Sequence, residues 1–276
     1  MQMEWSKTKT IFILAFLILD LYLAYSFYEM RSDSIVEPMV ETTTEEDLQL
    51  AGITYSKLPE SQEKGFYITA KSKEFTAEEI AKLKDQSQRS TIGESSITTL
   101  YMDLDKPFPL PDVNAEVKAD QFVKNNVLYG ELYHYWYSDE KSNTMIYIQE
   151  YKDNKIFQEL DEHIAMVILN LNEKNEIVSY NQSMLEDIKE VQEKEVTVSP
   201  LEAIGVLYTK NLLQMNSKIV EVDYGYYTNI PLSNQQILAP TWHLIVETNQ
   251  GERKDYYVNA LAGEVLQSSE KSIRSE

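Results

Sequence analysis

Cysteine is absent from this chain of 276 residues. The absence excludes a disulfide framework, a thiolate zinc site and a cysteine nucleophile. An exported domain without cysteine fits a bacterial surface better than a eukaryotic secreted module, where small domains are often rich in disulfides. Glycine is also scarce, at 8 residues, and the sequence holds no P-loop, GxGxxG or GxSxG pattern. The common phosphate-cradling and nucleophile-elbow motifs are therefore excluded.

Histidine occurs only as His134, His163 and His243, each in or at the start of a predicted strand. No second histidine follows at i+3 or i+4, and HExxH is missing, so a packed or surface ring is the default interpretation. Asp103 and Asp105 resemble the start of a calcium loop, but its glycine and distal glutamate are lacking. Nothing selects a catalytic pair among the 45 acids. We predict no catalytic residues, no metal site and no cofactor.

Basic residues are few, with 25 Lys and Arg against 45 Asp and Glu, for a net charge of −20. Residues 1–31 hold as many bases as acids, so the excess lies beyond them. Such a surface repels nucleic acid and offers no polybasic patch to anionic lipid. The 19 tyrosines argue against a disordered acidic chain.

One long apolar run is present, "IFILAFLILDLYLAYSFY" at residues 11–28. Eighteen helical residues rise roughly 27 Å, close to the hydrocarbon thickness of a bilayer. Eleven of them are Leu, Ile or Phe, each contributing about −0.3 to −0.6 kcal/mol, against about +2.5 to +3.5 kcal/mol for Asp20. We therefore predict a transmembrane helix over 11–28, after a cytoplasmic stub at 1–10.

The flanks of the run predict its orientation. Lys7 and Lys9 precede it, which places the N-terminus in the cytoplasm and the C-terminal domain outside the cell membrane, as in a single-pass protein. The alternative is a cleaved signal peptide. The triplet Ala24-Tyr25-Ser26 is a poor cleavage site and lies within the run, so retention is favoured.

Asp20 raises a question, because an acid in the middle of a membrane helix is costly. It is either a tolerated imperfection, protonated or snorkelling, or a polar contact with another transmembrane helix, as such residues usually face protein or water. Ala24, one turn later, lets a partner backbone approach closely. The second reading is favoured, and it predicts a partner-binding face made of Phe16, Leu17, Asp20 and Ala24.

The rest of the chain reads as an α+β protein. Residues 29–60 show no clear hydrophobic periodicity, and we predict a tether there. Residues 61–110 predict a first α/β segment, with a capping box at Thr76 and Glu79. Prolines at 107, 109 and 111 predict a break at its end.

Two α+β units are expected after this break, each a helix packed on an antiparallel sheet. The unit at 111–190 has Asn114 as N-cap and two hairpins, the second turning at 172–175. The unit at 191–276 has a capping box at Ser199 and Glu202, followed by strands around a turn at 249–251.

The run "YHYWY" at 133–137 is the most aromatic stretch. Alternating aromatics on a strand usually form a core face and an amphipathic outer face. The alternative is a surface that stacks sugars or peptide.

The opening "WSKTKTIFILAFLILDLYL", residues 5–23, closely resembles that of the YycI (WalI) family of Firmicutes. The ending "TWHLIV…GERKDYYVNALAGEV" is similar to a PepSY-like module, a more diffuse likeness. The resemblance implies a YycH-like fold and an accessory regulator, without enzymatic activity, of the sensor kinase WalK (YycG), which controls cell-wall metabolism. It also implies a complex with a YycH-like protein at the membrane, in which Asp20 is a polar contact within a helix bundle.

Two rival functions stay open. One is an extracytoplasmic ligand-binding or chaperone-like module that uses the aromatic strand faces. The other is an envelope hydrolase, which is disfavoured because the sequence shows no recognisable catalytic nucleophile and no set of metal ligands.

Overall fold

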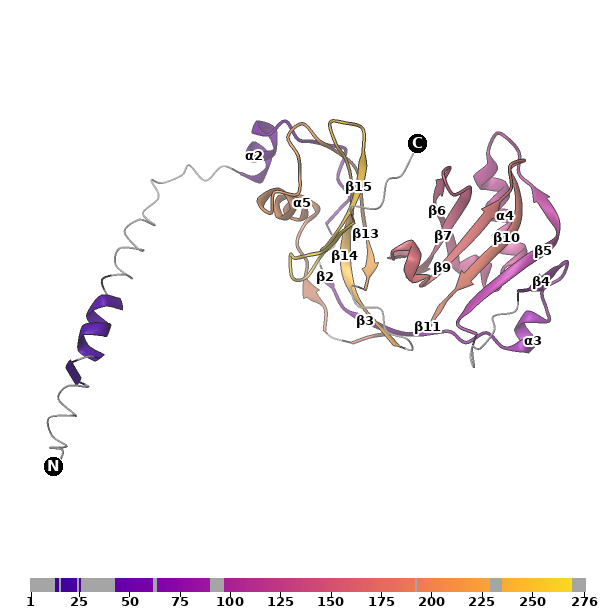
Figure 1. Cartoon of the computed structure of the whole chain (residues 1–276), viewed down its shortest axis with the longest axis horizontal. Helices are drawn as coiled ribbons and strands as arrows, with labels where there is room; N and C mark the ends of the chain where they lie inside the picture. The colour runs from indigo at the N-terminus through magenta and orange to yellow at the C-terminus, as the bar shows by residue number, and fades with distance from the viewer. Residues whose placement is uncertain are drawn as a thin grey trace, which may run out of the picture. The chain divides into compact units, whose positions relative to one another are not determined.

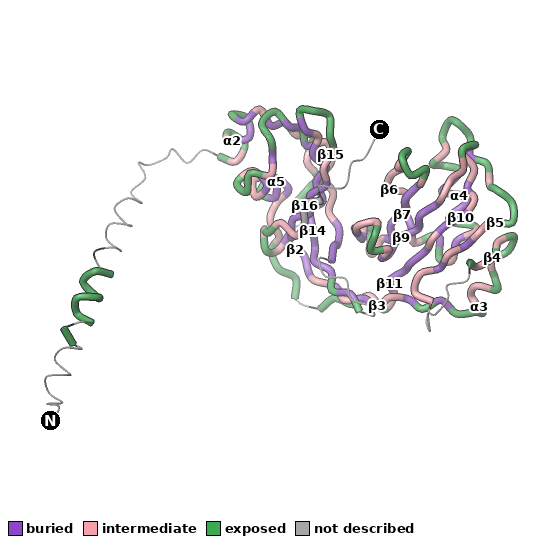
Figure 2. Tube along the Cα trace, viewed as in Figure 1, coloured by how far each residue is buried: buried purple, intermediate pink, exposed green. Residues whose placement is uncertain are grey.

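The computed structural model describes residues 13–14, 16–23, 25, 43–61, 64–89, 97–191, 193–228 and 235–269. The chain divides into two compact units, residues 1–43 and 44–276. In the first unit every described residue from 13 to 25 is helical and exposed, as Figure 2 shows in green.

The second unit is mostly sheet with few helices (Figure 1). Its helices are α2 (Thr44–Leu50), α3 (Ala77–Ile80), α4 (Ala115–Asn126), α5 (Pro200–Thr209) and the 3-10 turns η1 (Gly130–Leu132) and η2 (Leu160–Glu162). Its strands are β1 (Thr54–Tyr55), β2 (Lys64–Gly65), β3 (Ile68–Ser72), β4 (Gln86–Gln88), β5 (Thr99–Pro109), β6 (Tyr133–Asp139), β7 (Thr144–Tyr151), β8 (Asn154–Phe157), β9 (Met166–Leu171), β10 (Glu176–Ser183), β11 (Leu185–Glu190), β12 (Glu195–Val196), β13 (Lys218–Tyr227), β14 (Gln235–Glu247), β15 (Arg253–Asn259) and β16 (Val265–Ser269). The predicted α+β class is confirmed.

The first half of the sheet carries α4. Strands β4, β5, β10, β9, β7 and β6 follow one another by antiparallel pairing. One face of α4 brings Ala119, Phe122 and Val123 onto this sheet, where they join Met145, Tyr147 and other buried residues. Val117 of the same helix is exposed. Asn114 occupies the N-cap position as predicted, but its side chain makes no capping bond and its backbone is left-handed.

The second half carries α5 and α2. Both halves of the predicted capping box are present, because Ser199 accepts from the Glu202 backbone and Glu202 accepts from the Ser199 backbone. Ala203, Ile204 and Leu207 of α5 pack against β13, β14 and β15, together with Leu48 of α2. Helix α2 and strand β1 lie within residues 29–60, the range for which a tether was predicted. This part of the range is folded because buried Leu48 and Ile53 anchor it to the core beneath α5.

The inner faces of the two halves meet in a separate apolar cluster. Ile146 and Ile148 of β7 and Ile168 of β9 contribute from one half, and Tyr227 and Tyr257 from the other. Along β14 the side chains alternate, with Trp242, Leu244 and Val246 turned to α5. The second unit therefore contains two helix-on-sheet halves that also pack through their inner faces.

One strand, β8, joins the two halves into one sheet. Strand β8 pairs antiparallel with β7 and parallel with β13, where Gly225 lies opposite Lys155. Strand β3 pairs with both β11 and the start of β14. In the described chain, 14 strands are thereby connected. The pattern of separate hairpins did not predict this connection.

The expected break at the prolines is wrong for two of them. Pro107 and Pro109 lie within β5, which continues to Pro109. The neighbour β4 pairs only with residues 102–104 of β5, so the later part of β5 is an edge. Proline is tolerated at an edge because its missing N–H faces no partner strand.

Candidate functional site

The residues predicted to contact a partner helix belong to the first unit. Phe16 is 61% exposed and Leu17 is 52% exposed, and both lie on described helical residues with Asp20, also exposed. Ala24 lies outside the described residues. A helix that presents large apolar side chains around one acid has no core of its own to bury them. Three of the four predicted residues thus share one exposed helical segment.

Among the residues that the structure describes, no helix is both long and apolar enough to cross a bilayer.

A cleft forms in the second unit where two hairpin turns meet the start of α4. In the β6–β7 turn, the Asp139 carboxylate accepts from the Lys141 backbone at 3.0 Å and from Ser142 Oγ at 2.8 Å. In the β9–β10 turn, Asn172 Oδ1 accepts from the backbone N–H groups of Lys174 and Glu176 at 2.9 and 3.0 Å. Both are side-chain-to-backbone bonds of the kind that fixes short turns.

Backbone hydrogen bonds tie these segments together. Leu171 N–H donates to the Asn143 carbonyl at 2.9 Å, which joins one turn to the other. Leu110 N–H donates to the Asn175 carbonyl at 3.1 Å, which joins the second turn to the chain entering α4. The three walls of the cleft are therefore held by main-chain bonds.

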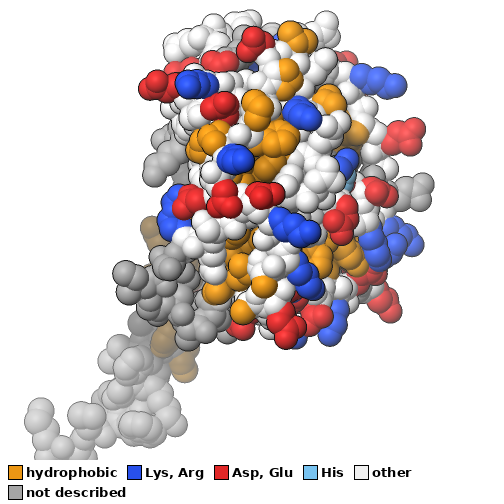
Figure 3. Space-filling view, turned by 90° about the vertical axis from the view of Figure 1, so that its right-hand side faces the viewer, with side chains coloured by type: hydrophobic (Ala, Val, Ile, Leu, Met, Phe, Trp, Pro, Cys, Tyr) orange, Lys and Arg blue, Asp and Glu red, His pale blue; other side chains and the backbone are white. Residues whose placement is uncertain are grey.

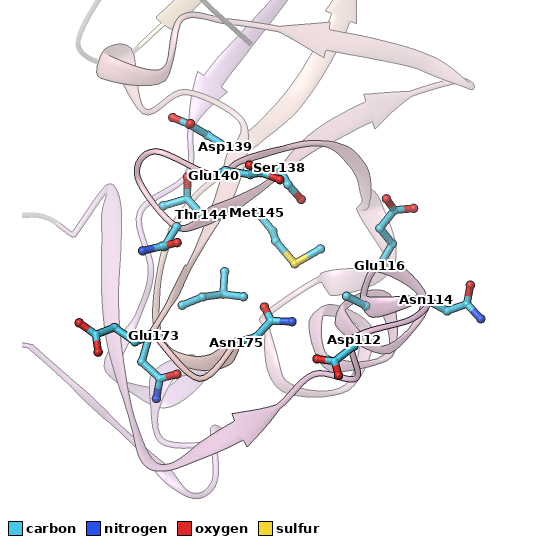
Figure 4. A pocket seen from close by; sticks show the side chains of 14 residues that line it. Asp112, Asn114, Glu116, Ser138, Asp139, Glu140, Thr144, Met145, Glu173 and Asn175 are labelled. Carbon is cyan, nitrogen blue, oxygen red and sulfur yellow. The ribbon is translucent and has the colours of Figure 1, made fainter. Parts of the chain in front are cut away.

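The cleft has a volume of about 650 Å³. Met145, buried in the first core, points into the middle of the ring of side chains in Figure 4, and Leu171 also lines the cleft. The acids of the lining are Asp112, Glu116, Asp139, Glu140 and Glu173. An apolar floor beneath a rim of carboxylates favours a cationic group with an aliphatic stem.

The aromatic run at 133–137 occupies β6, and the structure divides it. Tyr133 is buried and donates to the Ser183 carbonyl at 2.6 Å. A register shift between Tyr135 and Tyr137 follows. As a result Tyr135, Trp136 and Tyr137 all line a second cavity of about 450 Å³, together with Val220 and Ile245 of the other half.

Glu221 and Arg253 also line this second cavity. Burial raises the pKa of Glu221 above its usual range, and a hydrogen bond with Asp223 is the second largest cause of this shift. Arg253 donates to Glu247 at 3.3 Å. The second cavity therefore combines aromatic walls with a partly desolvated carboxyl.

The three histidines do not form a common site. His134 Nδ1 lies 3.1 Å from a Glu150 oxygen at the surface, and His163 ends η2 in a left-handed conformation. His243 is buried between the halves. In the part of the chain that the structure describes, no three His, Cys, Asp or Glu side chains are grouped to hold a metal ion. Asp103 pairs with Arg89.

The cleft was not predictable from the sequence, because its acids come from three separate segments. The aromatic run at 133–137 was the one part of these cavity linings that the sequence suggested as a binding surface, and three of its residues line the second cavity.

The chain resembles an uncharacterized protein from Eubacterium rectale ATCC 33656 of known crystal structure, at 13% identity and a TM-score of 0.40, over 76% of this chain and 88% of that one. Among curated proteins, none matches the chain.

Fold and surface define a mixed α+β protein with an acidic cleft and an exposed apolar N-terminal helix. The family described as YycI protein matches residues 32–261. The chain belongs to the YycI family, as the resemblance of its opening residues predicted. The family is regulatory, and membership implies an accessory regulator of the YycG/WalK pathway.

Proposed function

We propose that the protein is a membrane-anchored accessory regulator of the WalK (YycG) sensor kinase, acting through transmembrane-helix contacts and a complex with a YycH-like protein. The observation that carries the proposal is the exposed helical segment with Phe16, Leu17 and Asp20 in a chain of the YycI family. The segment spans the membrane as a single pass, with the N-terminus in the cytoplasm and residues 44–276 outside.

The proposed contact uses the acid. Phe16, Leu17, Asp20 and Ala24 are spaced at i, i+3 and i+4 intervals, so they share one helix face. A polar partner on a neighbouring helix then satisfies Asp20, which is otherwise costly in lipid. Regulation further requires that the complex binds one kinase state more tightly than the other, because equal binding shifts no equilibrium.

Asp20→Leu tests this contact, with Ile18→Ala on the opposite face as the control. Both variants should remain in the membrane fraction, since the Asp20 change adds apolar area. Asp20→Leu should recover less kinase and less YycH-like protein on purification from membranes, and should alter output of a reporter gene for the pathway. Unchanged recovery together with an unchanged reporter removes the role of Asp20.

A second candidate function is supported by the cavity that Tyr135, Trp136 and Tyr137 line. In this second proposal the protein is an extracytoplasmic ligand-binding module, and these residues contact the ligand. Thermal shift of the purified full chain with cell-wall fragments tests it, and no shift with any of them counts against it.

A further inference from the structure

The cleft and the second cavity adjoin. Both are lined by Glu116, Ser138 and Glu140, so they meet at the end of the β6–β7 hairpin and the first turn of α4. We call the two together the acidic groove. It runs from the β9–β10 turn in the first half to β13, β14 and β15 in the second.

Charge in the acidic groove has one predominant sign. Six acids line it, namely Asp112, Glu116, Asp139, Glu140, Glu173 and Glu221. Arg253 is the one basic residue among the described lining residues, and Glu247 accepts a bond from it. Lys141 and Lys174 belong to the two turns but do not line the groove. In the face seen in Figure 3, acidic and basic side chains are interleaved.

The walls beneath these acids are apolar and aromatic. Met145 and Leu171 line one end, and Tyr135, Trp136 and Tyr137 line the other. The rings of Trp136 and Tyr137 meet edge to face at 5.0 Å. Lysine and arginine match such walls, because their aliphatic stems cover apolar surface and their charged ends interact with aromatic faces and carboxylates. A hydrated metal ion would gain little from these walls, because apolar and aromatic side chains supply no oxygen ligands.

We propose that the acidic groove binds an extended segment of another protein that carries at least two lysine or arginine side chains, one seated in each cavity. This inference gives a ligand class to the second candidate function and rests on it, but it does not depend on Asp20 or on the membrane. Glu116 and Glu140, which face both cavities, contact the segment at its centre. The desolvated Glu221 gains a cationic partner at the aromatic end.

The test uses the purified full chain and a labelled peptide, Lys-Ser-Lys-Ser-Lys-Ser, with binding followed by fluorescence anisotropy at fixed ionic strength. The same peptide with acetylated lysines is the ligand control, because acetylation removes the charge and keeps most of the stem. We expect the unmodified peptide to bind at least tenfold more tightly, and its affinity to fall as salt increases.

Two double variants with the same change in net charge separate the groove from general attraction to an acidic protein. Glu116→Gln with Glu140→Gln should weaken binding at least tenfold. Glu78→Gln with Glu195→Gln, two acids outside the groove lining, should weaken it less than twofold. Unchanged circular dichroism and melting temperature establish that both variants are folded.

Equal weakening by the two double variants overturns the proposal, because binding is then unspecific. Equal binding of the acetylated peptide overturns it as well. If a spermine probe displaces nothing while the peptide binds in the groove, the requirement for a polypeptide segment is supported. If the peptide fails and cell-wall fragments still shift the melting temperature, the inference fails while the second candidate function stands.

Discussion

His243 Nε2 lies 2.6 Å from Oδ1 of Asp255, and both side chains are enclosed between the two halves of the sheet. The imidazole stacks on Tyr257 at 4.9 Å between ring centres and packs against Phe157 at 4.7 Å. With Asp255 ionised, Nε2 carries the proton and donates it, and Nδ1 has no hydrogen-bond partner in the described structure. The bond joins β14 to β15, and the ring joins both to β8.

Breaking this pair on one side should be costly. His243→Ala or Asp255→Asn should lower the free energy of unfolding by about 1.5–3 kcal/mol, because each removes one partner of a buried hydrogen bond to a carboxylate. The double change His243→Phe with Asp255→Leu should cost much less than either single change, since it leaves no buried charge. Urea denaturation of the full chain in detergent, followed by tryptophan fluorescence, measures both. Equal losses in all three variants would show that the packing of the rings, rather than the hydrogen bond between His243 and Asp255, sets the stability.

Glu79 should make stability depend on pH in the acid range. A hydrogen bond from Tyr129 and another from the Thr76 backbone, with Lys73 at 3.1 Å, lower the pKa of Glu79 to about 2. A lowered pKa gives stability that is complete above the usual value of about 4.3 and is lost as pH falls toward 2. Glu79→Gln should cost about 1–2 kcal/mol at pH 7 and flatten the pH dependence between about 4.5 and 2.

The neighbouring exposed acid supplies the control for that measurement. Glu78→Gln should leave the acid unfolding curve unchanged, because Glu78 lies in the same helix turn and is exposed. An identical acid response in the Glu78 and Glu79 variants would contradict the role assigned to Glu79.

Gly225 should tolerate no side chain. A Cβ there would lie 2.2 Å from the Lys155 carbonyl oxygen and 2.5 Å from the Phe157 ring, at the point where β13 pairs with β8. Gly225→Ala should lower the free energy of unfolding by about 1–3 kcal/mol or more, because backbone must move. The control is Gly205→Ala in α5, where the close neighbour is the Thr44 side chain and alanine favours the helix. Chemical denaturation compares the two, and equal effects would contradict the assignment.

Local features of the fold were predictable from sequence. The capping boxes at Thr76 and Ser199 and the turn at 172–175 depend on residues within four positions of each other, and all are present. The helix after Thr76 is short and ends at Ile80. Ile80 and, beyond the helix, Leu83 pack on the apolar core beneath α4.

Long-range features were not predictable in the same way. Strand β8 has four residues and no alternating pattern of its own, yet it joins the two halves. Its position depends on Gly225, whose closeness to Lys155 cannot be read from either segment alone. The acidic groove has the same origin, because backbone bonds of Leu110 and Leu171 bring its walls together. The helix contact at Phe16, Leu17 and Asp20 stays a prediction.

The pairing of early strands with late ones has a consequence for how the protein is made. Strand β1 lies beside β13, and β3 lies between β11 and β14, so residues near 54 and 70 find their neighbours only from residue 185 onward. A nascent chain must therefore hold its first strands open until most of it has been synthesised. Pairing between such distant residues is slow. During that wait, the chain is at its most exposed to proteases and to its own copies.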